Sequence, residues 1–211
     1  MQNVKKLFLL FFFSAFSLSA MAKSPEIVKA IKAGDLGLVQ KLVDSGTDID
    51  ILIKKKYEDY TETLLHRAIY EEQPEILRFL IKKFKENDIS IDKMGSGYGS
   101  ALMYACSQGY YKYAEILINN GANINFDNGG GETPFLLAIV ANGPIRNRIK
   151  CCQLLKAAGA KLTLRYSDLM YLIEYPNHYT KTMDFAKKNM SLASKARYFL
   201  CKTITFLHKR S

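Results

Sequence analysis

Tryptophan is absent from this chain, and histidine occurs only three times in 211 residues. His178 and His208 have no acidic residue or cysteine beside them, and His66 has no second histidine nearby. The H-E-x-x-H, G-x-S-x-G, phosphate-loop and dinucleotide-binding patterns are also missing. These absences argue against an enzyme, and we expect no catalytic residue, no metal site and no cofactor.

No apolar stretch approaches the roughly 20 residues that a membrane-spanning helix needs. The strongest candidate is Leu7–Phe13, which follows Lys5 and Lys6 and leads through a serine-rich segment to Ala20-Met21-Ala22. A basic start, a short apolar core and a small-x-small exit are typical of a secretory signal peptide. We therefore expect a signal peptide over 1–22, cleavage after Ala22 and a mature chain in the periplasm or outside the cell. A membrane anchor is the less favoured alternative.

One stretch, Ser100–Asn125, contains a complete repeating unit. It predicts a small-residue helix that ends at Gly109, then a second apolar helix, then a turn at Gly121. Its first six residues read S-A-L-M-Y-A and its last five read G-A-N-I-N. These sequences are similar to T-P-L-H-x-A, the opening signature of the ankyrin repeat, and to the G-A-D-V-N with which that family closes its unit. The stretch therefore resembles an ankyrin repeat.

The unit recurs along the chain. Its signature alanine falls at Ala30, Ala68, Ala105 and Ala138, at spacings of 38, 37 and 33 residues, against a family period of about 33. Insertions between helices account for the excess. The resemblance implies an all-α repeat solenoid with a helical C-terminal cap. The expected segments are four ankyrin repeats within 23–163, at 23–53, 63–95, 100–128 and 133–163, and a capping region with a basic amphipathic helix over 164–211.

Two positions depart from the family pattern. Glu72 stands where the first helix of a repeat usually ends at glycine. Phe84 stands where the glycine that closes the second helix is expected, and about four extra residues follow before Ile91-Asp92. Elsewhere the resemblance implies structural roles. The ring of His66 braces the turn at the start of its helix, and glycines close the second helices at Gly46, Gly121 and Gly159.

Members of the ankyrin-repeat family bind other proteins through a concave face made by hairpins and first helices, so the resemblance implies a protein partner. Tyr and Arg among carboxylates are typical of interface cores. We expect Tyr60, Arg67, Tyr70 and Tyr104 to be exposed along one continuous strip; the alternative is a solvent-facing surface without a partner. The mapped residues are Asp59, Tyr60, Glu62, Arg67, Tyr70, Glu71, Tyr104, Ser107 and Gln108.

Four cysteines need an account if the chain is exported to an oxidising compartment. Cys106, Cys151 and Cys152 fall at repeat positions that are usually small and buried, which favours buried free thiols. A disulfide between Cys106 and one of the neighbouring pair is the alternative. The sequence leaves the state of Cys201 open.

The net charge of +10 is distributed unevenly. Residues 23–160 hold 18 basic and 17 acidic residues, whereas residues 161–211 hold 10 basic and 3 acidic. Two hypotheses follow. The favoured one is an exported monomeric module, a scaffold or an inhibitor or immunity-type binder of an envelope protein. The other is a peripheral membrane protein whose basic C-terminal helix contacts anionic lipid. Nucleic acid is not expected as a partner.

Overall fold

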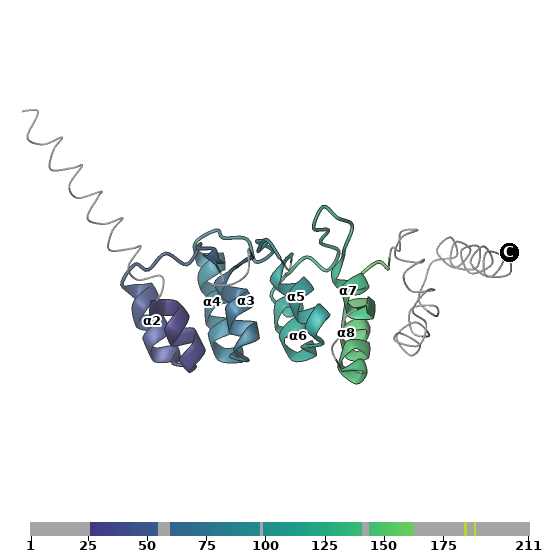
Figure 1. The fold of residues 1–211 in the computed structure, drawn as a ribbon, viewed down its shortest axis with the longest axis horizontal. Coiled ribbons are helices and arrows are strands. Elements are labelled where there is room, and N and C mark those ends of the chain that lie inside the picture. Colours follow the sequence, from purple (N-terminus) through teal and green to yellow (C-terminus); the bar gives the residue numbers. More distant parts are fainter. Residues whose placement is uncertain are drawn as a thin grey trace, which may run out of the picture. The chain divides into compact units, whose positions relative to one another are not determined.

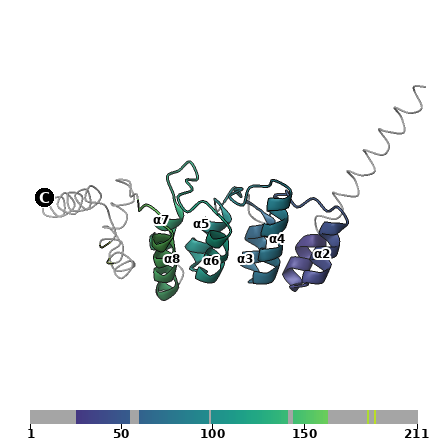
Figure 2. The same cartoon turned by 180° about the vertical axis from the view of Figure 1, so that it is seen from behind.

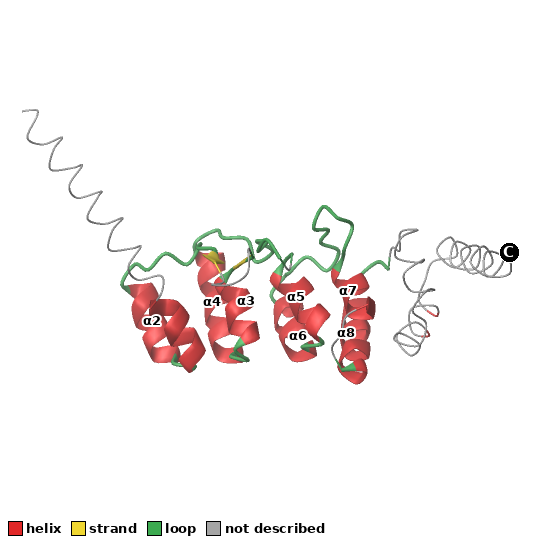
Figure 3. Cartoon of the chain, viewed as in Figure 1, coloured by secondary structure: helices red, strands yellow, loops and turns green. Residues whose placement is uncertain are grey.

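The computed structural model describes residues 26–54, 60–97, 99–140 and 144–162, together with Asp184 and Lys188. The predicted signal peptide, Asp59, Cys201 and, except for those two single residues, the predicted cap lie outside this part of the chain. Within it the chain is mostly helical, with one two-stranded sheet, as Figure 1 and Figure 3 show. This agrees with the predicted all-α class. No helix in the described ranges is long and apolar enough to cross a membrane.

The chain divides into two compact units. Unit 1 holds the residues up to Ser90 and the short segment Gly95–Gly97, and unit 2 holds Ile91–Met94 and the residues from Tyr98 onward. Each unit has its own buried core, so each is described separately.

Unit 1 begins with a helical segment over 26–33, followed by α2 (Leu36–Asp44). The antiparallel strands β1 (Ile53–Lys54) and β2 (Thr61–Glu62) form the hairpin of the enlarged connection, with Ile53 opposite Glu62. Then come α3 (Leu64–Tyr70) and α4 (Pro74–Glu86), and α4 contacts both α2 and α3. The largest fully buried side chains of this unit include Ile27, Ile31, Leu65, Leu77 and Phe84.

Unit 2 contains α5 (Ala101–Gln108), α6 (Tyr111–Asn119), α7 (Pro134–Val140) and α8 (Ile145–Ala157). The first helix, α5, contacts α6, α7 and α8, and α8 contacts α6 and α7, an arrangement visible from both sides in Figures 1 and 2. Because three helices surround α5, six of its eight residues are buried.

A serine or threonine hydroxyl caps the N-terminus of the first helix in the third and fourth repeats. Ser100 accepts a hydrogen bond from the backbone N–H of Met103 at 3.4 Å, and Thr133 accepts one from Leu136 at 3.3 Å. Such caps satisfy N–H groups that have no partner inside the helix. The signature Ser or Thr therefore fixes where each of these helices starts.

The end of α4 contradicts the expectation that the extra residues of the second repeat form a loop. Phe84 does not end the helix; it is fully buried inside α4, which continues through Glu86. The left-handed closing residue is Asp88, with φ of 54°, and the N–H of Ile89 bonds the carbonyl of Phe84 at 2.8 Å. Burial of a large aromatic side chain stabilises the extra turn. The additional residues in this repeat are therefore mainly helix rather than loop.

Candidate functional site

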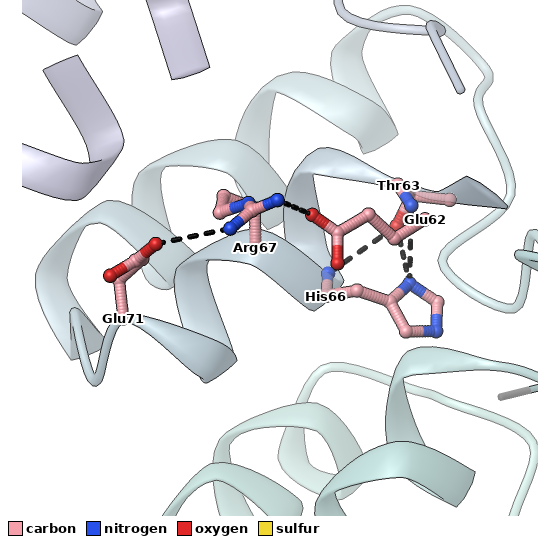
Figure 4. A network of polar contacts seen from close by, with 5 residues as sticks. All are labelled: Glu62, Thr63, His66, Arg67 and Glu71. Carbon is pink, nitrogen blue, oxygen red and sulfur yellow. Dashed lines mark hydrogen bonds and ion pairs between the residues drawn. The ribbon is translucent and has the colours of Figure 1, made fainter. Parts of the chain in front are cut away.

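The start of α3 is fixed by a reciprocal contact between Thr63 and His66, drawn in Figure 4. The Thr63 hydroxyl accepts from the His66 N–H at 3.5 Å, and His66 Nδ1 accepts from the Thr63 N–H at 3.4 Å. The side chains also meet, with 2.8 Å between Oγ1 and Nδ1. The His66 ring is buried, so it takes the bracing position that the family resemblance implies.

Arg67 lies one residue further along α3 and holds two carboxylates. Its Nη2 pairs with Oε1 of Glu62 on β2, and its Nη1 lies 3.1 Å from Oε1 of Glu71, as Figure 4 shows. Its guanidinium carbon is 5.6 Å from the centroid of the Tyr70 ring, a cation–π distance. Glu62 and Arg67 are 3% and 8% exposed. The pair therefore ties the sheet to the helix, and removing one partner would leave a buried charge uncompensated.

Three mapped residues are not free contact residues. We expected Arg67 and Tyr104 to be exposed, and this is wrong: Tyr104 is only 6% exposed. Glu62, also mapped to the face, is buried as well. The physical reasons differ. Arg67 is drawn against Glu62 and Glu71 by charge, whereas Tyr104 is buried because α5 is covered on several sides.

Among the mapped residues of unit 1 that the structure describes, Tyr60 and Tyr70 are the exposed ones. These two residues are 47% and 50% exposed, and Glu71 beside Tyr70 is half-buried. Gly97 lies directly under Tyr60, since a Cβ at Gly97 would come within 2.5 Å of ring atom Cδ1. Sequence reasoning missed Leu52, which is 47% exposed just before β1. Its position in the enlarged connection between the first and second repeats could have indicated that it is exposed.

In unit 2 the mapped surface is modest. Gln108 is exposed and Ser107 half-buried. The Ser107 hydroxyl donates to the Tyr104 carbonyl at 2.9 Å, and Gln108 Nε2 donates to the Ser107 hydroxyl at 3.2 Å. Because these two side chains already form hydrogen bonds within α5, they have less capacity to contact a partner than the tyrosines of unit 1.

Two further aromatic contacts that involve none of the mapped residues lie at the start of α6 and between α6 and α8. Lys150 Nζ is 4.1 Å from the centroid of the Tyr111 ring. The Tyr110 and Tyr113 rings meet edge to face at 5.9 Å. These residues are not among those predicted from the sequence, although the run Y-Y-K-Y at 110–113 marks an unusual density of tyrosine. The contacts belong to second helices, which the family resemblance does not assign to the binding face.

Three buried thiols lie between α5 and α8. Cys106, Cys151 and Cys152 are all free and fully buried, as the favoured interpretation of the sequence required. A hydrogen bond with Cys151, together with burial, raises the pKa of Cys106 well above its usual range. Burial, with the neighbouring Cys151, raises the pKa of Cys152 to about 12, although Arg148 opposes the shift. Since the thiolate is the reactive form, Cys106 and Cys152 are poor nucleophiles at neutral pH.

Metal binding has little support in the described ranges, where no group of three or more His, Cys, Asp or Glu is placed to hold an ion.

Comparison with protein families gives a direct match. A family model described as "Ankyrin repeats (3 copies)" matches residues 18–128 and 96–166. Together these ranges cover well over half of the chain and contain all four predicted repeats. The predicted repeat fold is therefore confirmed.

Curated relatives share the same segment. The chain is 30% identical over 143 residues to synphilin-1 from Mus musculus, covering 66% of this chain and 15% of that protein. It is 27% identical over 154 residues to the ankyrin repeat, SAM and basic leucine zipper domain-containing protein 1 of Eulemur macaco macaco, covering 72% and 23%. Over 96 residues it is 32% identical to the ankyrin repeat and SOCS box protein 3 of Bos taurus, covering 46% and 17%. The chain thus spans less than a quarter of the length of each.

Proposed function

The chain belongs to the ankyrin-repeat family, whose members bind other proteins, and we propose that it is an exported module that binds an envelope protein. In this role it acts as a scaffold or as an inhibitor or immunity-type binder. The observation that carries the proposal is the pair of half-exposed tyrosines, Tyr60 at the hairpin and Tyr70 on α3, the first helix of the second repeat. Tyrosine is enriched at interface hot spots because it buries a large apolar ring and keeps a polar tip.

The backbone under these tyrosines is held before a partner arrives. Thr63 and His66 fix the start of α3, and Arg67 links that helix to β2 through Glu62. Gly97 lies against the Tyr60 ring. A surface that is already ordered loses less conformational entropy when it binds. This order supports recognition by a fixed surface.

The test begins with capture of a partner from envelope extract and proceeds to titration with purified proteins. Replacing Tyr60 and Tyr70 together by alanine should weaken binding by about 2 kcal/mol or more, which is about 30-fold or more in Kd. Thermal stability should change little, because substitutions at exposed positions usually alter it by within about 0.5 kcal/mol.

The matched control changes charge in the C-terminal segment, with Lys202→Glu and Lys209→Glu in one chain. This variant should bind normally. If it loses the partner while the double tyrosine variant retains it, the tyrosine surface is not the site.

Export is part of the proposal. The support is the sequence pattern of Lys5 and Lys6, the apolar run and Ala20-Met21-Ala22. Mass spectrometry of the protein from the envelope or culture medium should find Lys23 at the N-terminus. A chain recovered there with Met1 intact would contradict cleavage after Ala22.

Charge favours a second candidate function, contact with an anionic membrane surface. Residues 161–211 carry 10 basic and 3 acidic side chains, and basic segments are attracted to anionic lipid. Sedimentation with phosphatidylglycerol vesicles, with and without residues 191–211, tests this. Salt-sensitive binding that disappears with the deletion would support a membrane role. Binding that is unchanged by the deletion would contradict it.

A further inference from the structure

The second helices of unit 2 are basic, and carboxylates do little to offset that charge. Helices α6 and α8 together carry five basic side chains and one acidic side chain. On α2 and α4, the second helices of unit 1, five basic side chains accompany three acidic ones. The charges of α4 are also paired, as in the contact of Lys83 with Asp44 at 3.5 Å. The basic residues of α6 and α8 are Lys112, Arg146, Arg148, Lys150 and Lys156.

Lys112 and Arg146 do not stabilise the helices that carry them. Both side chains are exposed, and neither forms an ion pair within the part of the chain that the structure describes. Each is the second residue of its helix, and no acidic residue stands in the first turn of α6 or α8. The helix dipole disfavours a cation at this end. Residues that depart from a local stability rule in this way are often found at functional sites.

The two helix starts lie close together, so their charges and tyrosines form one surface. Helix α6 contacts α8, and a Cβ at Gly109, just before α6, would lie 3.3 Å from the Cβ of Asn147. Lys150, whose Nζ is 4.1 Å from the centroid of the Tyr111 ring, follows Arg146 by four residues and therefore shares its helix face. We define the α6–α8 surface as Tyr110, Tyr111, Lys112, Tyr113, Arg146 and Lys150.

We propose that the α6–α8 surface binds an anionic lipid membrane. Its three tyrosines are half-buried, and tyrosine is enriched at membrane–water interfaces because its ring is apolar and its tip is polar. Lysine and arginine reach lipid phosphates on long stems whose apolar part stays near the ring level. A protein partner fits this composition less well, because lysine is depleted at protein–protein interfaces.

The place of the surface in the chain also favours a membrane. Helix α8 ends at Ala157, and residues 161–211, with 10 basic and 3 acidic side chains, follow it closely. Two linked basic regions bind one membrane more tightly than either does alone, since the second contact is intramolecular. The inference extends the second candidate function to another surface, and it holds whether or not residues 161–211 contact lipid.

Charge reversal tests the surface in the chain from Lys23 to Ser211. The test variant carries Lys112→Glu and Arg146→Glu. Sedimentation with vesicles of mixed phosphatidylcholine and phosphatidylglycerol should show that it binds about 30-fold more weakly, or worse, which corresponds to about 2 kcal/mol for two charges. The matched control carries Lys41→Glu and Lys82→Glu, at exposed positions on α2 and α4. It has the same net charge and should keep most of its binding.

Loss of structure would not explain weaker binding by the test variant. Glutamate at the start of a helix is favoured by the dipole, so this variant should melt at the wild-type temperature or slightly above it. Thermal denaturation of both variants measures this.

A tryptophan reporter locates the contact. The chain contains no tryptophan, so Tyr113→Trp places a single reporter in the α6–α8 surface and Tyr70→Trp places one in unit 1. Vesicles should shift the emission of the first reporter to shorter wavelength, and brominated acyl chains should quench it, because the ring lies at the lipid interface. The emission of the second reporter should not change.

Four results would overturn the proposal. The first is failure of the wild-type chain to bind the mixed vesicles, and the second is equal binding by the two charge-reversal variants. The third is emission of the Tyr113→Trp reporter that vesicles leave unchanged. The fourth is capture of an acidic protein through Lys112 and Arg146 without vesicle binding. Equal binding by the two variants together with loss of binding on deletion of residues 191–211 would leave the second candidate function standing and remove only the α6–α8 surface.

Discussion

Glu72 occupies a backbone conformation that usually belongs to glycine. Its φ is 55° at the turn between α3 and α4, and the glycines at the same turn of other repeats, Gly34 and Gly109, have φ of 69° and 72°. A side chain at positive φ is strained because its Cβ approaches the backbone. The turn still forms, with the Gln73 N–H bonding the Ala68 carbonyl at 2.8 Å. Packing of the helices therefore imposes the angle on a residue that does not favour it.

Replacing Glu72 by glycine should stabilise the protein. Relief of the strained angle should add about 0.5–1 kcal/mol to the free energy of unfolding, after the greater flexibility of glycine in the unfolded chain is included. Urea denaturation measures the change. The control is Lys82→Gly, at an exposed position within α4. This variant should instead have a free energy of unfolding lower by about 1 kcal/mol. Equal losses in both variants would contradict the explanation.

Gly121 also has a positive φ, and a side chain placed there would meet no neighbouring atoms. Its φ is 90°, as its place in the repeat predicted, and a Cβ there would have nothing within 4 Å. Gly121→Val should therefore cost on the order of 1 kcal/mol or more through backbone strain alone. Position 37 lies inside α2. Gly37→Ala should therefore raise the free energy of unfolding, since alanine favours a helix by about 1 kcal/mol over glycine. An unchanged thermal midpoint in Gly121→Val would count against the assignment.

At the scale of elements, α3 depends on charge as well as on its cap. The helix has six buried residues among seven, including His66 and Arg67. The aliphatic side chains of α3 are buried because they pack against α4. The buried guanidinium of Arg67, in contrast, needs a charged partner. Glu62 supplies it from β2. This ion pair thus links β2 to α3.

A double-mutant cycle on this ion pair measures its contribution. Arg67→Met should lower the free energy of unfolding by about 3 kcal/mol, because it leaves the Glu62 carboxylate buried and uncompensated. Glu62→Leu alone should cost less, because Glu71 still pairs with the Arg67 guanidinium at 3.1 Å. The double variant should recover much of the loss, since apolar residues of similar size often replace a buried pair at little cost. Strictly additive losses would contradict the coupling.

The elements were largely predictable because the repeat signature marks both the start and the end of each helix. The caps at Ser100 and Thr133, and the left-handed turns at Gly109 and Gly121, follow from residue types alone. Exposure was less predictable. Tyr104 holds a variable position of the signature, yet it is buried, because the number of helices around α5 depends on tertiary packing that no local pattern encodes.

Side-chain pairing was the other unpredictable feature of the candidate site. The repeat pattern assigns Arg67 to a surface position, but Glu62 and Glu71 lie close enough to form ion pairs with it. The contact with Glu71 follows helical spacing of four residues. The contact with Glu62 depends on the path of the hairpin, and that connection is longer than the family norm. Sequence spacing therefore could not place it.

At the scale of the whole molecule, stability should be distributed by unit. Each unit contains its own buried aliphatic core. In repeat proteins the stability of a segment depends mainly on its own contacts and on those of its neighbours. Damage in one unit should be felt most strongly in that unit.

Hydrogen exchange resolved by element tests this expectation. Arg67→Met should accelerate exchange of amides in α3 and α4, because their local opening becomes easier. Amides of α8 should keep most of their protection. Acceleration by the same factor in α3, α4 and α8 would show that the chain unfolds as one cooperative body and would contradict the expectation.

The chain does not pass from one unit to the other at a single peptide bond. Ile91–Met94 belongs to unit 2, and Gly95–Gly97 returns to unit 1 before the chain finally leaves it. In unit 1 the Ser96 N–H bonds the Thr61 carbonyl at 3.0 Å, and a Cβ at Gly95 would collide with that same oxygen. In unit 2 both Asp92 carboxylate oxygens accept from the Asn123 N–H at 3.0 Å.

A gene recombined between codons 90 and 91 would therefore separate Ser96 from Thr61, and one recombined between codons 97 and 98 would separate Asp92 from Asn123. Neither crossover yields two complete halves. Ankyrin repeats are often treated as interchangeable cassettes, but here the second and third repeats have to be inherited, duplicated or exchanged together with the overlapping segment. The smallest exchangeable piece of this part of the chain is larger than one repeat.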